Sequence, residues 1–96
     1  MYTQVVIFKL KGDVSRRNFL DASANMLLWL KQCPGFMDYA LYEGPEGWCD
    51  TVFWQSKACA EQGMHAFYRS ELSKEIVDLV EPGFTSFFGT PVPVLS

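Results

Sequence analysis

The sequence lacks a surplus of basic side chains and has no long apolar run. Of its 96 residues, 8 are Lys or Arg and 11 are Asp or Glu, which gives a net charge of −3. Nucleic-acid-binding proteins carry a basic stripe, whereas the densest basic run here is Arg16-Arg17. No stretch approaches the roughly 20 apolar residues that span a bilayer, and the start lacks the basic residues and long apolar run of a signal peptide. We expect a cytoplasmic protein that binds neither nucleic acid nor membrane.

Metal-binding and disulfide frameworks are missing as well. The cysteines, Cys33, Cys49 and Cys59, are odd in number and form no CxxC pair, and His65 is the sole histidine. Zinc sites of the usual spacing need more such ligands, while a free cysteine packs as a small hydrophobic residue. We therefore predict neither a metal nor a cofactor.

Apolar side chains, in contrast, are abundant for a chain of this length. Hydrophobic residues make up 49% of the sequence and aromatic residues 16%, but only 20% is charged. The length suits one domain, residues 1–96. A small monomer cannot easily hide this much apolar surface, so the composition predicts an association surface.

The apolar pattern predicts the order strand, helix, strand, strand, helix, strand. Ser15 and Ser56 are suited to cap the two helices, and the second helix is expected to bend near Ser70. The predicted ranges are strands 2–11, 36–43, 48–54 and 84–90, and helices 15–32 and 56–81. This order is typical of the α+β ferredoxin-like fold, a four-stranded antiparallel sheet with helices on one face. RNA-recognition motifs share it, but the third strand here contains no Lys or Arg, so we reject RNA binding.

The predicted strands are apolar on both faces. The first strand has four consecutive apolar residues from Val5 to Phe8, the third has Val52 to Trp54, and the fourth has Phe87-Phe88. Helices on one side of an antiparallel sheet should instead produce alternation of apolar and polar residues. We therefore predict a symmetric homodimer in which two sheets pack face to face.

Three segments of the sequence are distinctive: Pro34-Gly35-Phe36, the strand 50–54 that leads into Ser56, and the closing "DLVEPGFTSFF" at 78–88. With them the sequence resembles the antibiotic biosynthesis monooxygenase-like family of the dimeric α/β-barrel superfamily. The resemblance implies a homodimer whose two sheets close as a dimeric α/β barrel, with a pocket between each sheet and its helices. Members include cofactor-independent oxygenases of polycyclic phenols and haem-degrading enzymes.

The haem-degrading members of that family have a pattern that this sequence does not match. Their pattern requires an Asn in the first strand, a Trp in the second helix and a His later in that helix. The corresponding positions here hold Val5, Gly63 and Ser73. The phenol-oxidising members use Asn, Trp and Tyr side chains near the pocket, and no such set can be placed on this sequence. The resemblance therefore disfavours haem degradation and assigns no catalytic residues.

Four residues are candidates for a ligand pocket: Trp29, Trp54, Met64 and Phe67. Trp29 lies at the edge of the apolar stripe of the first helix, and Trp54 ends the third strand. Met64 and Phe67 lie on the apolar stripe of the second helix. An indole offers an aromatic ligand both a flat face and an N–H donor. Ordinary core packing is the alternative explanation for these residues.

Three residues are candidates for proton transfer: Tyr39, Asp50 and His65. The histidine pKa suits that role near neutral pH, but at 100° per residue His65 falls opposite the apolar stripe, which favours a surface position. Tyr39 and Tyr42 have odd spacing in a strand, so only one of them can face a given cavity. Burial would raise the pKa of Asp50 and make it a base, whereas an exposed aspartate would only cap a turn.

Two functions follow as hypotheses. The first is a monooxygenase-like protein that binds a small aromatic molecule and oxidises a polycyclic phenol without a cofactor. The second is a non-catalytic homodimer that binds a small apolar ligand or a partner protein. Fold resemblance alone does not select between them.

Overall fold

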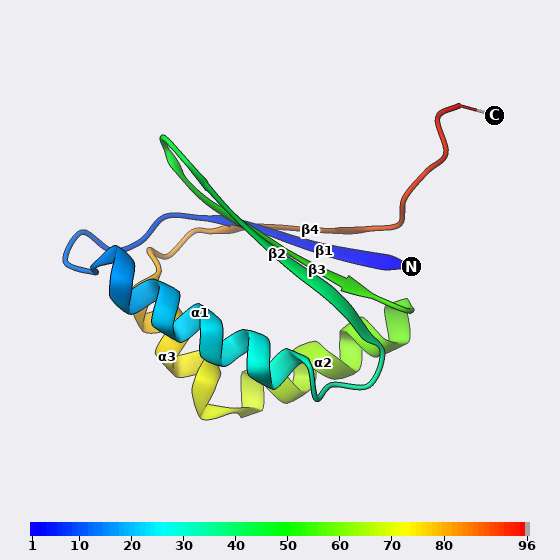
Figure 1. Ribbon diagram of the computed structural model, residues 1–96, viewed down its shortest axis with the longest axis horizontal. Helices are drawn as coiled ribbons and strands as arrows, with labels where there is room; N and C mark the ends of the chain where they lie inside the picture. Colours follow the sequence, from blue (N-terminus) through cyan, green and yellow to red (C-terminus); the bar gives the residue numbers. More distant parts are fainter. Residues whose placement is uncertain (96) are drawn as a thin grey trace.

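The computed structural model describes residues 1–95 and has two layers, a sheet and a layer of helices (Figure 1). Its elements are β1 (Tyr2–Phe8), α1 (Arg16–Leu30), β2 (Phe36–Gly44), β3 (Gly47–Trp54), α2 (Lys57–Arg69), α3 (Glu71–Leu79) and β4 (Thr85–Gly89). The four strands pair in the order β2-β3-β1-β4, and every pair is antiparallel. The predicted α+β ferredoxin-like architecture is confirmed.

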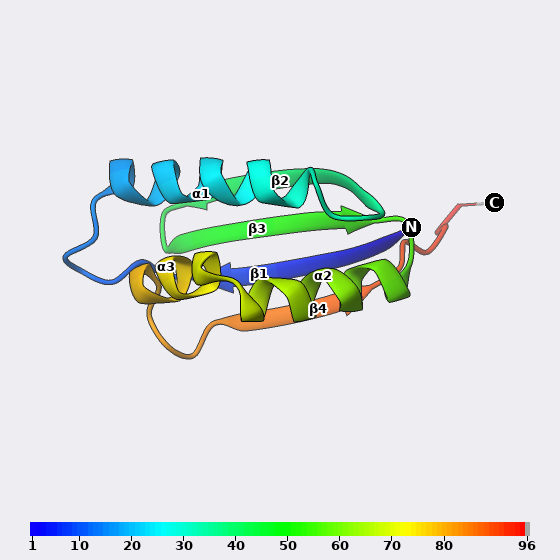
Figure 2. The same cartoon turned by 90° about the horizontal axis from the view of Figure 1, so that it is seen from below.

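All the helices lie on one face of the sheet. Seen from the helix side, α1 lies along β2 and β3, whereas α2 and α3 lie along β1 and β4 (Figure 2). The helices therefore form two rows over one face of the sheet and leave the opposite face uncovered.

Local sequence signals set the helix starts. The Ser15 hydroxyl accepts a hydrogen bond from the Asn18 backbone N–H, and the Ser56 hydroxyl accepts one from Cys59. Both bonds satisfy N–H groups that have no partner inside the helix. These two predicted caps are confirmed.

The structure corrects two predicted boundaries. The bend expected near Ser70 is a full break, because Ser70 has extended backbone angles (φ −88°, ψ 156°) and separates α2 from α3. The first strand ends at Phe8 instead of Lys11, since its pairing with β4 begins at Ile7 and only an isolated bridge at Leu10 follows. Beyond Phe8 no strand remains alongside to continue the ladder.

The buried core forms two clusters. The Trp54 cluster joins residues of α1, β3 and α2: Met26, Leu30, Val52, Trp54 and Ala60. The Phe19 cluster is smaller and consists of Phe8, Phe19 and Trp48, with the rings of Phe19 and Trp48 4.9 Å apart and edge to face. The two clusters pack at opposite ends of α1, and the region between them holds the site described below.

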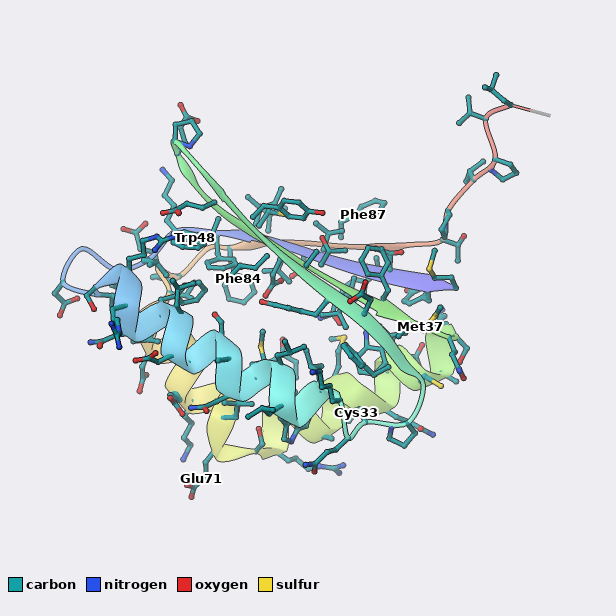
Figure 3. All side chains as sticks on the ribbon, viewed as in Figure 1. Cys33, Met37, Trp48, Glu71, Phe84 and Phe87 are labelled. Atoms are coloured by element: carbon teal, nitrogen blue, oxygen red, sulfur yellow. The ribbon has the colours of Figure 1, made fainter. Side chains whose placement is uncertain are left out.

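The uncovered face of the sheet is apolar, as the strand pattern predicts. Ile7, Tyr42 and Phe87 lie on it with exposed fractions of 55%, 58% and 65%. Val5 pairs with Phe87 across β1 and β4, which makes this apolar surface continuous. Phe87 points away from the helices, whereas Phe84 lies on the helix side (Figure 3). We call the surface of Val5, Ile7, Tyr42, Phe53 and Phe87 the outer face.

The chain after β4 runs away from the sheet without regular structure, as its prolines predict (Figure 1). Within residues 1–95, no helix combines the length and the apolar character needed to cross a membrane.

Candidate functional site

A cavity of about 200 Å³ lies between the sheet and the helices. Side chains from β1, β3, β4 and all three helices line it. The four predicted pocket residues, Trp29, Trp54, Met64 and Phe67, are among them. Tyr68, Phe84 and Phe88 also line the cavity but are exposed, so they mark its opening. Cavities of about 150 Å³ admit benzene, and this one therefore has room for a somewhat larger aromatic molecule.

Asp50 is the one carboxylate among the cavity-lining residues that the structure describes. It lies at the centre of the sheet, where its register partners are Val6 on β1 and Leu41 on β2. Along β3 the next residues on the same face are Trp48 and Val52, both buried. Burial raises the pKa of Asp50 to about 6. A carboxylate on an apolar floor with this pKa can accept a proton near neutral pH.

Tyr39 supports Asp50 from the neighbouring strand. Its hydroxyl donates a hydrogen bond to Asp50 Oδ2 at 3.3 Å. Burial raises the pKa of Tyr39 above its ordinary value of 10.0, and the charge of Asp50 raises it further. Tyr39 therefore keeps its proton and remains a donor, while its hydrogen bond acts to lower the pKa of Asp50. Tyr42 points to the outer face, so the two tyrosines lie on opposite faces of the sheet.

Trp54 combines a core position with contact to the cavity. It is only 1% exposed, and its Nε1–H donates to Oε1 of Gln4 at 3.4 Å. A Cβ atom at Gly63 would lie 2.8 Å from Cζ2 of the indole, so α2 approaches the ring this closely only because residue 63 is glycine. Most contacts of Trp54 are therefore those of a core residue, and only part of its surface faces the cavity.

Trp29 and Phe67 form the wall of the cavity between α1 and α2. Their rings are 5.9 Å apart at an angle of 66°, an edge-to-face contact. Trp29 is only partly buried, so its ring is accessible from the cavity. Its indole is better placed than that of Trp54 to contact a bound ring.

His65 lies apart from these residues. It is exposed on α2 and is not among the residues that line the cavity. The structure therefore brings Tyr39 and Asp50 together but leaves His65 on the surface. Among residues 1–95, no three His, Cys, Asp or Glu side chains are grouped to hold a metal ion.

Comparison with solved structures places the fold. SnoaB, a cofactor-independent oxygenase from Streptomyces nogalater, superposes with a TM-score of 0.83 at 15% identity over 98% of this chain and 95% of that one. A monooxygenase from Streptomyces coelicolor, ActVA-Orf6 in complex with nanaomycin D, superposes with a TM-score of 0.77 at 21% identity. The match covers 99% of this chain and 90% of that one. An antibiotic biosynthesis monooxygenase superposes with a TM-score of 0.79 at 16% identity, over 97% of this chain and 100% of that one. The chain has the antibiotic biosynthesis monooxygenase fold.

The predicted resemblance to the antibiotic biosynthesis monooxygenases is thereby confirmed in three dimensions. No family model matches the sequence, and a comparison with curated proteins finds no match. Identities of 15 to 21% relate backbones and do not transfer site residues.

Sequence reasoning missed several polar residues of the cavity, among them Gln4 and Ser23. Gln4 accepts the indole hydrogen bond of Trp54. Ser23 lies on the buried face of α1 and is 5% exposed, and within residues 1–95 its hydroxyl has no hydrogen-bond partner. The available signal for Ser23 was its place between Phe19 and Met26 on the apolar stripe of that helix. A polar residue at such a position needs a partner inside the fold.

Proposed function

We propose that this protein is a homodimeric, monooxygenase-like protein that binds a small aromatic molecule and oxidises a phenol without a cofactor. The observation that carries this proposal is the Asp50 carboxylate on the floor of an aromatic-lined cavity. Two proteins of the same fold, SnoaB and ActVA-Orf6, are an oxygenase and a monooxygenase, which supports the choice of reaction.

Asp50 is the proton acceptor in this proposal, and Tyr39 positions it. With a pKa of about 6 the Asp50 carboxyl is mostly ionised at neutral pH, so it can take the proton of a bound phenol. The apolar surroundings exclude water, which strengthens this proton transfer. The Tyr39 hydroxyl holds the carboxylate by its hydrogen bond to Oδ2. Trp29 and Phe67 contact the ring of the ligand.

The proposed reaction uses only the phenol and O₂. The phenol gives its proton to Asp50, and the anion transfers one electron to O₂. The phenoxyl radical and superoxide combine to form a C–O bond at a ring carbon, and the proton returns to the terminal peroxide oxygen. The O–O bond then breaks: hydroxide leaves with the hydrogen of that carbon as water, and the remaining oxygen becomes a carbonyl. One hydroxyarene and one O₂ thus give one quinone and one water.

The alternative is a non-catalytic homodimer that binds a small apolar ligand or a partner protein. It is favoured by the contacts of Trp54, whose N–H bonds Gln4 and whose ring packs against Gly63. Such contacts are those of an ordinary core residue. It is also favoured by the absence of a second carboxylate among the described lining residues. This alternative predicts that the cavity takes up a ligand and releases it unchanged.

We propose that the homodimer forms by packing of the outer faces of two copies. An exposed apolar surface on a sheet whose other side is already packed needs a cover. A second copy of the same face is the simplest cover, because a two-fold axis lets each sheet pack on the other. The cytoplasmic location expected from the sequence stays a prediction.

The test combines binding and turnover in one sample. Intrinsic tryptophan fluorescence is titrated with 1-naphthol and with 1,8-dihydroxyanthrone while oxygen consumption is recorded. We expect saturable quenching together with oxygen uptake above the buffer rate. The oxygen uptake should be lost in Asp50→Asn. Quenching without uptake supports the non-catalytic alternative.

A matched pair of tryptophan variants separates cavity binding from surface association. Trp29→Phe removes an indole that lines the cavity and is expected to weaken binding. Trp48→Phe removes an indole that is buried against Phe19 but does not itself line the cavity, and it should leave the affinity unchanged. Equal affinities for the two variants would contradict the assignment of this cavity as the binding site.

A further inference from the structure

Ser23 on α1 and Asp50 on β3 line the same cavity, and each lies between residues of the two core clusters. On α1, Ser23 lies between Phe19 of one cluster and Met26 of the other. On β3, Asp50 likewise lies between Trp48 and Val52, which belong to the same two clusters. Because α1 and β3 contribute to both clusters in the same order, the two polar residues lie at the same level of the fold. Both line the same cavity.

The hydroxyl of Ser23 is unusual for a serine inside a helix. Such a serine ordinarily bonds a backbone carbonyl three or four residues earlier, as Ser73 does with Ser70 O at 2.8 Å. Ser23 is 95% buried, yet in the described part of the chain its Oγ has no protein partner. A buried hydroxyl without a partner costs stability, so its place at the cavity wall requires another explanation.

We infer that Ser23 donates a hydrogen bond to the ligand oxygen whose proton Asp50 accepts. This inference rests on the proposed function. A single oxygen between the helix layer and the sheet can receive the Ser23 hydroxyl from one side while facing the Asp50 carboxylate on the other. As the phenol loses its proton, the anion gains charge at that oxygen. The Ser23 hydrogen bond then strengthens, because hydrogen bonds to charged acceptors are stronger than those to neutral ones.

The donor on the helix side thus has a specific consequence for the ligand. It stabilises the phenolate over the phenol and lowers the pKa of the bound molecule, as donors aimed at a developing oxyanion do. It also selects molecules with an oxygen on the inserted ring, because an unsubstituted aromatic would leave Ser23 without a partner and the Asp50 carboxylate with the Tyr39 hydrogen bond alone. Naphthalene should therefore bind more weakly than 1-naphthol.

The experiment measures the ionisation of a bound chromophore. The probe is 4-nitro-1-naphthol, whose phenolate absorbs visible light, titrated with pH in the presence of saturating protein. In Ser23→Ala the ionisation constant of the bound probe is expected to fall about tenfold relative to the wild type, the value of one charge-assisted hydrogen bond. Ser23→Thr keeps the hydroxyl and is expected to restore the wild-type value.

Two controls separate this role from a structural one. Ser73→Ala removes a buried helix serine that does not line the cavity, and the ionisation of the bound probe should not change. Without the probe, Ser23→Ala should unfold at the same temperature as the wild type or higher, because it removes an unpartnered polar group. Ser73→Ala should unfold at a lower temperature, because it breaks the bond to Ser70.

The outcomes distinguish this inference from the proposed function. If the probe binds to wild type and Ser23→Ala but ionises at the same pH in both, the role of Ser23 is refuted while aromatic binding stands. A lower unfolding temperature for Ser23→Ala with unchanged probe ionisation would also refute it. If the wild type binds neither 4-nitro-1-naphthol nor 1-naphthol, the proposed function fails and the inference fails with it.

Discussion

The buried carboxylate should make the protein less stable as the pH rises. The pKa of Asp50 is about 6 in the folded protein against an ordinary value of 3.8. Between these values the folded state binds the proton and the unfolded state does not, so the free energy of unfolding falls as the pH rises from about 4 to about 6. Above pH 6 the full cost of the buried charge is present.

Asp50→Asn should abolish this cost. The difference between 3.8 and about 6, at about 1.4 kcal/mol for each pH unit, corresponds to roughly 3 kcal/mol. The asparagine oxygen can still accept the Tyr39 hydrogen bond, so little else changes. At pH 7.5 the variant should therefore be more stable than the wild type by about 2 to 3 kcal/mol. For a domain of this size that raises the unfolding temperature by about 10 to 20 °C.

The assay is thermal unfolding, followed by circular dichroism at pH 4 and pH 7.5 at one fixed protein concentration. The gain in Asp50→Asn should be large at pH 7.5 and nearly absent at pH 4, where the wild-type carboxyl is protonated. Asp21→Asn is the matched control, because that carboxylate is exposed on α1 and should not show this pH-dependent gain. Equal or lower stability of Asp50→Asn at pH 7.5 would refute the reasoning.

Three further predictions concern the surroundings of the site and the outer face. Tyr39→Phe removes the hydrogen bond that lowers the pKa of Asp50, so the decline of stability should extend to higher pH in the same unfolding assay. Gly63→Ala places a methyl group against the Trp54 ring, and urea unfolding should show a loss of about 1 to 3 kcal/mol. Ile7→Lys puts a charge on the outer face, and sedimentation should show 10.9 kDa monomers where we expect dimers of the wild type.

Each of these variants has a matched control in the chain. Tyr42→Phe alters a tyrosine of the same strand on the opposite face of the sheet, and the pH dependence of stability should stay as in the wild type. Gly12→Ala adds a methyl group where nothing lies within 4 Å, so no loss from overpacking is expected. Leu28→Lys changes an exposed leucine on α1, and the protein should remain dimeric. A wild-type protein that is strictly monomeric at micromolar concentration would contradict the dimer.

Local signals in the sequence were sufficient to predict the element order, except that the second predicted helix is broken into α2 and α3 at Ser70. Ser15 and Ser56 cap the helices by bonds to residues three positions away, and such contacts depend on nearby residues alone. The alternation of side chains along a strand likewise placed Tyr39 and Tyr42 on opposite faces. The consecutive apolar residues of β1 indicated two apolar faces, because a sheet in contact with water on one side would not need them.

Residues far apart in the chain decided the site. The sequence by itself offered Tyr39, Asp50 and His65 as separate candidates, and only the register of β2 on β3 brings the first two within hydrogen-bond distance. Ser23 had the same periodic signal as its apolar neighbours, so nothing local distinguished a satisfied hydroxyl from one that faces a cavity. Helical periodicity determines which side of a helix is buried. Only the packing of α1 on β3 decides what lies opposite each buried side chain, because that contact joins layers distant in sequence.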